Sequence, residues 1–192
     1  DEQAVQVVHR AFQLGLNLVD TAPLYGAGKS EKRLGLALKE VPRDSYILAS
    51  KVGRILVPTE AGESDGGIFE NPPPFKPVFD YSYDGIMRSW EDSLQRLGLS
   101  SIDVLLIHDL DSFFHDSEQR FSAHLNQLIT SGWRALDELR SQGLIKAVGT
   151  GLNRMGALPR LIDAVDLDLS IVAMPYTLLD QEVLEEEFPL CE

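Results

Sequence analysis

Four residues of proton-exchanging types stand at or just after short apolar runs of the chain. Asp20, Lys51 and His108 each follow such a run, and Tyr25 comes five residues after Asp20. A carboxylate, an ammonium, an imidazole and a phenol can together hold and move a proton on a substrate oxygen. Taken singly, each has an ordinary explanation, because such a tyrosine usually packs and such a lysine usually points to solvent. If the four share one location, acid–base chemistry becomes the better explanation.

The elements that would position these residues alternate regularly along the chain. Apolar periodicity predicts about five strands, at 16–20, 46–51, 102–107, 145–148 and 169–174. It also predicts about six helices, near 5–16, 30–39, 83–97, 125–141 and 155–165 and from 181 onward. Each strand is almost continuously apolar, which indicates parallel pairing with both faces of the sheet covered. The fold class is therefore α/β, with any chemistry at the carboxyl ends of the strands.

Two α/β architectures compete, the open doubly wound sheet and the closed (β/α)8 TIM barrel. A dinucleotide-binding open sheet should show G-x-G-x-x-G after an early strand, and the chain has no such motif. Polar groups at the ends of several successive strands favour the barrel. Because a full barrel takes about 250 residues and eight βα units, we expect residues 1–192 to form an incomplete portion of a single barrel domain.

Composition limits the partners of the chain. Its 192 residues include 17 Lys and Arg against 30 Asp and Glu, a net charge of −13 that argues against nucleic acid. The apolar runs fall far short of the ~20 residues of a membrane helix, so we expect no membrane partner. The single cysteine, Cys191, cannot form an internal disulfide, which is typical of a cytoplasmic protein. We expect no metal.

The segment Gly26-Ala27-Gly28-Lys29-Ser30 imitates the end of a phosphate-binding loop. The full motif, G-x-x-x-x-G-K-[ST], requires a glycine five residues before Gly28. That position is Pro23, which has no backbone N–H to donate to a phosphate. We interpret the segment as a turn followed by a helix whose N-cap is Ser30.

Residues 53–82 interrupt the alternation of strands and helices. They contain five prolines and show no sustained periodicity, which predicts a long loop. Structureless loops of this length are uncommon inside domains and are usually functional or disordered. The aromatic residues Phe69, Phe75, Phe79 and Tyr81 favour a substrate lid over a partly disordered excursion.

The segments around the four candidate residues carry a family likeness. Asp-Thr-Ala-x-x-Tyr-Gly at 20–26, Ser-Lys-Val-Gly at 50–53 and Leu-Leu-Ile-His at 105–108 resemble the aldo-keto reductase superfamily. Phe-Asp-Tyr-Ser-Tyr-Asp-Gly at 79–85 looks closest to its D-threo-aldose 1-dehydrogenase (L-fucose dehydrogenase-like) branch. The resemblance implies a (β/α)8 barrel from which this chain lacks the N-terminal strand and the C-terminal βα units.

The resemblance also implies a reaction. Hydride would pass between NADP or NAD and a small-molecule substrate, an aldose or a similar hydroxyl or carbonyl compound. Tyr25 would be the general acid/base, with Lys51 stabilising its phenolate form, Asp20 holding Lys51, and His108 orienting the substrate oxygen. An ordinary tyrosine has a pKa near 10, which is why a neighbouring cation is needed.

The resemblance to the family is weaker at the residues expected to bind the cofactor. Asp20, Gly151 and Asn153 are the expected cofactor-binding residues, although many relatives have serine where this chain has Gly151, and glutamine where it has Ala173. These positions leave the choice between NAD and NADP open, as well as the substrate and the oligomeric state. Two other functions remain open: a non-catalytic cofactor-binding redox-sensing subunit, and a barrel isomerase that uses the lysine and histidine.

Overall fold

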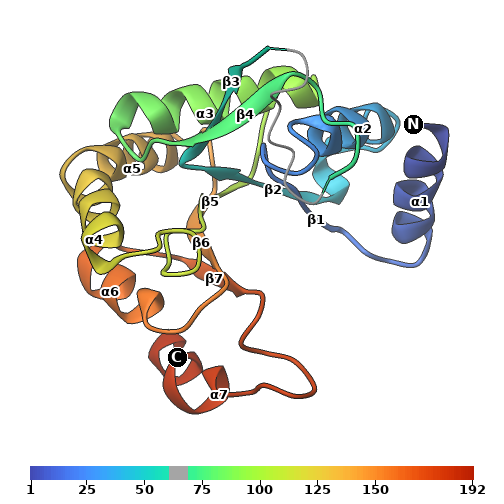
Figure 1. The fold of residues 1–192 in the computed structure, drawn as a ribbon. Coiled ribbons are helices and arrows are strands. Elements are labelled where there is room, and N and C mark those ends of the chain that lie inside the picture. The colour runs from blue at the N-terminus through green and yellow to red at the C-terminus, as the bar shows by residue number, and fades with distance from the viewer. Residues whose placement is uncertain (61–68) are drawn as a thin grey trace.

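The computed structural model describes residues 1–60 and 69–192, so residues 61–68 of the expected lid lie outside the described residues. Five strands form one parallel sheet whose spatial order follows the chain, like part of a barrel wall (Figure 1). The strands are β1 (Leu18–Asp20), β2 (Ile47–Val52), β5 (Val104–His108), β6 (Ala147–Leu152) and β7 (Leu169–Val172). This half-barrel confirms the α/β prediction and the incomplete (β/α)8 barrel.

The register of this sheet brings the polar strand ends to one edge. Asp20 pairs with Ala49 of β2, two residues before Lys51. The carboxyl end of β5 lies beside that of β6, where His108 pairs with Gly151. Because all these strands run in one direction, their terminal side chains share one rim.

The helices are α1 (Glu2–Gln13), α2 (Lys29–Leu38), α3 (Tyr83–Leu97), α4 (Glu118–Gln127), α5 (Trp133–Ser141), α6 (Ala157–Ala164) and α7 (Val183–Glu186). Most of the helices lie against one face of the sheet, whereas α1 lies beside α2 and α7 lies near the C-terminus, away from the strands (Figure 1). The main core joins Leu105 and Ile107 of β5 to helical residues such as Leu136. Val104 and Leu106, which alternate with them, pack in a separate cluster on the opposite face. Within the described ranges no helix is long and apolar enough to cross a membrane.

The segment predicted to be a loop contains a β-hairpin, which corrects that prediction for its described parts. Strands β3 (Arg54–Pro58) and β4 (Phe75–Phe79) pair antiparallel, with Arg54 opposite Phe79. Prolines in both strands concealed the hairpin from the sequence pattern. A two-stranded sheet tolerates them because each strand has an unpaired edge.

The helix predicted at 125–141 also differs from the one in the structure. It begins with α4 at Glu118 rather than at Leu125, and a π-helical turn, Leu128–Gly132, joins α4 to α5. This helix holds the chain as it leaves the hairpin: Gln127 Oε1 accepts a 3.0 Å hydrogen bond from the amide of Tyr81. The hairpin is therefore anchored to the helical layer at its exit.

Candidate active site

Lys51 lies at the centre of the candidate site. Its side chain is buried near the end of β2, and its Nζ lies 2.6 Å from Asp20 Oδ2 at the end of β1. The same nitrogen donates a 2.9 Å hydrogen bond to the carbonyl oxygen of Thr21. Adjacent parallel strands thus hold a buried ammonium between two oxygens, as the predicted pairing of Asp20 with Lys51 requires.

Tyr25 lies beside this ammonium. Lys51 Nζ is 4.8 Å from the centre of the Tyr25 ring, and the His108 ring stands edge-on to it at 6.0 Å. The structure therefore brings Asp20, Tyr25, Lys51 and His108 together. Within the described part of the chain, no hydrogen bond joins the Tyr25 hydroxyl to Lys51 or His108.

His108 is held in its uncharged form. Its side chain is almost wholly buried, and burial, followed by the charges of Arg54 and Lys51, holds the pKa of His108 well below its usual value. Its Nε2 lies 3.2 Å from Asp109 Oδ2, and its buried Nδ1 has no hydrogen-bond partner among the described residues. A neutral imidazole that donates through Nε2 has Nδ1 as an acceptor. At neutral pH His108 is therefore a poor source of protons.

Asp109 and Arg54 were not singled out from the sequence, yet both border His108. Asp109 turns the chain after β5 in a left-handed conformation, with φ +53°, and Asn153 donates a 2.7 Å hydrogen bond to its Oδ1. Arg54 Nη2 lies 3.1 Å from Asp109 Oδ2. Burial, the largest influence, raises the pKa of Asp109 to about 6. The sequence could have pointed to both residues, because each is adjacent to a segment that carries a candidate residue. Asp109 follows His108 directly, and Arg54 follows the Ser-Lys-Val-Gly run.

The expected cofactor residues lie at the same rim. A Cβ on Gly151 would be 3.5 Å from Lys51 Cε, an ordinary contact, so the end of β6 borders the buried lysine. Asn153 uses its amide nitrogen on Asp109 and its backbone N–H on Asp111. Its amide oxygen is the side-chain atom that remains for the N–H of a nicotinamide carboxamide. An acceptor oxygen at Asn153 fits the N–H of that carboxamide, although the glycine supplies no hydroxyl.

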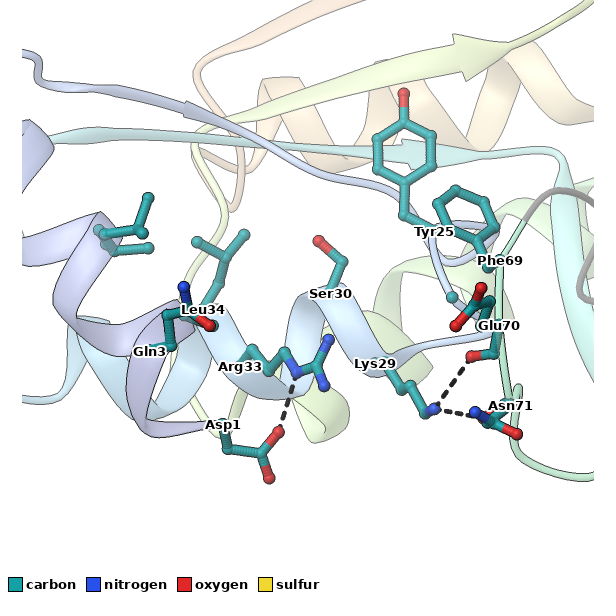
Figure 2. A pocket seen from close by; sticks show the side chains of 14 residues that line it. Asp1, Gln3, Tyr25, Lys29, Ser30, Arg33, Leu34, Phe69, Glu70 and Asn71 are labelled. Carbon is teal, nitrogen blue, oxygen red and sulfur yellow. Dashed lines mark hydrogen bonds and ion pairs between the residues drawn. The ribbon is translucent and has the colours of Figure 1, made fainter.

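The turn before α2 is unlike a phosphate loop. Gly28, not Ser30, is the N-cap of α2, and Ser30 Oγ lies 2.8 Å from Thr21 Oγ1. The amides of Lys29 and Ser30 donate to carbonyl oxygens of the preceding turn, and Lys29 Nζ donates to the carbonyl oxygens of Glu70 and Asn71 (Figure 2). The expected Ser30 cap is therefore wrong, and the groups a phosphate would need are already engaged.

A cavity of about 1000 Å³ lies between α1, α2 and residues 69–71. Tyr25 is at its edge, with its hydroxyl pointing away from Lys29 (Figure 2). The ring of Phe69 lies 6.1 Å from that of Tyr25. Asp20, Lys51 and His108 do not line the cavity, so the candidate active site lies on the other side of Tyr25. Across residues 1–60 and 69–192, no group of three or more metal-ligating side chains could hold a metal ion.

A parallel half-barrel with an acid, a phenol, an amine and an imidazole at the carboxyl ends of its strands has the architecture of a TIM-barrel enzyme. The model of the aldo/keto reductase family matches residues 1–192, and the chain belongs to this family.

Relatives of the chain include proteins named as dehydrogenases. It is 40% identical to pyridoxal 4-dehydrogenase of Microbacterium luteolum, over 97% of this chain and 56% of that protein. It is 37% identical to D-threo-aldose 1-dehydrogenase of Pseudomonas sp, over 100% of this chain and 56% of that protein. The chain thus spans a little over half the length of these two relatives.

Solved structures share its fold. An aldo-keto reductase from Bacillus halodurans in its holo form superposes with a TM-score of 0.73 at 29% identity, over 99% of this chain and 54% of that one. A glycerol dehydrogenase from Gluconobacter oxydans gives a TM-score of 0.70 at 27% identity, over 96% and 48%.

Proposed function

We propose that the protein containing this chain is a nicotinamide-dependent oxidoreductase that transfers hydride between NADP or NAD and an aldose or a similar small hydroxyl or carbonyl compound. Support comes from family membership, from the names of the two dehydrogenase relatives and from the clustered side chains. The observation that carries the proposal is the Lys51 ammonium, which lies between the Asp20 carboxylate and the Tyr25 ring.

Tyr25 is the proposed acid/base. In the oxidative direction its phenolate takes the proton of the substrate hydroxyl while the carbon bearing that hydroxyl gives up a hydride, so an alcohol becomes a carbonyl. In the reverse direction the phenol returns the proton. A nicotinamide cofactor, when bound, would supply or accept the hydride. Lys51 stabilises the phenolate by its charge, and Asp20 keeps the ammonium in place.

His108 orients the substrate oxygen in this scheme. Because burial keeps the pKa of His108 well below its usual value, the imidazole is neutral when Tyr25 exchanges its proton. The scheme therefore assigns proton transfer to Tyr25, and it assigns to His108 only a hydrogen bond with the substrate oxygen. Asp20, Gly151 and Asn153 are the proposed cofactor contacts within this chain, and the hairpin with its connection (residues 53–82) is the proposed lid.

The test is Tyr25→Phe in the full-length protein, assayed with a panel of sugars and aldehydes and with both cofactors. We expect turnover to fall about 10²- to 10⁴-fold, with cofactor binding, followed by nicotinamide fluorescence, nearly unchanged. Tyr83→Phe is the matched control. The Tyr83 hydroxyl donates its hydrogen bond to Glu138 on α5 and not to a proposed site residue, so its loss should leave turnover intact. Full activity of Tyr25→Phe would reject the assignment. Tight cofactor binding without turnover of any substrate by the wild type would favour a redox-sensing subunit.

A further inference from the structure

Arg54 is a buried cation that the scheme above does not use. It opens β3 directly after Gly53, and its side chain is only 5% exposed. Its Nε and Nη2 form no hydrogen bond within the described part of the chain, although Nη2 lies 3.1 Å from Asp109 Oδ2. Buried donors without partners are costly and therefore rare in folded proteins. A ligand atom that accepts from them would remove that cost.

Aromatic rings surround this guanidinium. Arg54 Cζ lies 4.5 Å from the centre of the Phe79 ring and 4.0 Å from that of Phe114. Guanidinium N–H bonds lie in the plane of the group, so contacts with ring faces do not satisfy them. The rings exclude water, and a hydrogen bond formed in such surroundings is stronger than one in solvent.

The charges of Arg54 and Asp109 indicate what kind of ligand group could bind beside them. Arg54 and Asp109 form an ion pair of opposite charges, so their net charge does not favour an anion. Together they offer N–H donors and a carboxylate acceptor side by side. A hydroxyl group both accepts and donates a hydrogen bond, and it matches this pair in a way that an apolar substituent cannot.

The pair lies next to the proposed reacting centre. Asp109 Oδ2 is 3.2 Å from Nε2 of His108, the residue proposed to orient the reacting oxygen. Oxygens on adjacent carbons of a substrate are separated by about the length of one hydrogen bond. We propose that Arg54 and Asp109 form a subsite for the hydroxyl on the carbon next to the reacting carbon, so that the enzyme favours 2-hydroxy carbonyl compounds over simple aldehydes. This inference rests on the proposed function.

The experiment compares 2-hydroxypropanal with propanal, which differ only in that hydroxyl. The full-length protein is assayed for reduction of each aldehyde with both cofactors. We expect wild-type kcat/KM to be about 10- to 100-fold higher for the hydroxylated aldehyde, the range for a hydrogen bond to a charged group. Arg54→Met should bring the two values together by lowering that for 2-hydroxypropanal far more than that for propanal.

Two further variants keep the test decisive. Asp109→Asn has nearly the same shape and tolerates the left-handed backbone, so it should reduce the preference even if Arg54→Met folds poorly. Arg134→Met is the matched control, because that guanidinium also lies over a ring, Tyr83 at 4.4 Å, but is exposed on α5. It should retain the full preference.

The outcomes separate the two proposals. If the wild type reduces both aldehydes with equal kcat/KM, or if Arg54→Met and Asp109→Asn keep the wild-type ratio, the subsite is rejected and the oxidoreductase stands. If the wild type reduces neither these aldehydes nor any compound of the wider panel, the proposed function fails, and the subsite fails with it.

Discussion

The hydroxyl of Tyr81 donates a 2.7 Å hydrogen bond to the main-chain carbonyl oxygen of His108. Tyr81 has no exposed surface, and burial, the largest influence, raises its pKa well above the usual value. Its ring occupies the space where a side chain at Gly53 would begin, since a Cβ there would lie 2.3 Å from the ring. One buried phenol therefore connects the end of β2 to the carbonyl of the proposed substrate-orienting histidine.

Tyr81→Phe removes this hydrogen bond and leaves the His108 carbonyl oxygen without its phenol donor. We expect the free energy of unfolding to fall by about 1–3 kcal/mol, measured by urea denaturation. Tyr83→Phe is the control, because the Tyr83 hydroxyl binds Glu138 where water can replace it, and its loss should be clearly smaller. Equal losses in the two variants would contradict the structural role given to Tyr81.

Gly35→Ala tests how closely α2 packs against α3. Alanine normally stabilises a helix interior by about 0.5–1 kcal/mol relative to glycine. At this position, however, a Cβ would lie 1.9 Å from the carbonyl oxygen of Leu97, so the helices would have to separate. We expect a net loss of about 1–3 kcal/mol in thermal or urea unfolding. Gly151→Ala, whose Cβ would make only an ordinary contact, should cost less, and a stabilised Gly35→Ala protein would refute the close packing.

The strands of the half-barrel were predictable because each is an apolar run bounded by polar residues. The same pattern located Asp20, Lys51 and His108, which end or nearly end their strands. The hairpin was not predictable in this way. Its pairing of Leu56 with Pro77 joins residues that local propensity assigns to a loop, and the pairing depends on contacts made after the chain turns back.

The contact between Arg54 and Asp109 was not predictable from periodicity, although both residues are neighbours of candidate site residues in the sequence. Arg54 reaches Asp109 because it follows the end of β2, which pairs with β5, and the chain at Asp109 turns with a positive φ. Neither feature leaves a periodic signal. Gly132 is similar, because the π-helical turn brings it so close to Tyr81 that a Cβ would lie 2.1 Å from that residue's carbonyl oxygen.

The lowered pKa of His115 predicts how the free energy of unfolding depends on pH. Burial, followed by the charges of His124 and Arg54, lowers the pKa of His115 to about 4, while Asp111 and Asp116 act in the opposite direction. Between that value and the usual 6.5, the unfolded chain binds more protons than the folded one. This contribution to the free energy of unfolding is therefore present above pH 6.5 and is lost as the pH falls toward 4.

His115→Gln isolates this contribution, because glutamine can form hydrogen bonds but does not titrate. Urea unfolding of both proteins at several pH values from 7 to 4.5 should show the wild type losing more stability than the variant. Asp109, with its pKa raised to about 6, contributes the opposite slope over part of this range, but it is present in both proteins and cancels. Parallel curves for the two proteins would show that His115 takes up its proton as easily folded as unfolded.

The buried ion pair of Glu31 and Arg96, which contacts β2 at Ser50, can be tested with a double-mutant cycle. The Glu31 carboxylate is wholly buried, accepts a 2.9 Å hydrogen bond from Ser50 Oγ, and lies 2.5 Å from Arg96 Nε. Glu31→Met leaves a mostly buried guanidinium without its partner, so we expect a loss of about 3–5 kcal/mol. Adding Arg96→Met removes the uncompensated charge and should recover most of that loss, because two apolar side chains can replace a buried ion pair. Denaturation of wild type, both single variants and the double variant measures the coupling energy. If the two single losses simply add, the contact between Glu31 and Arg96 contributes nothing to the support of β2.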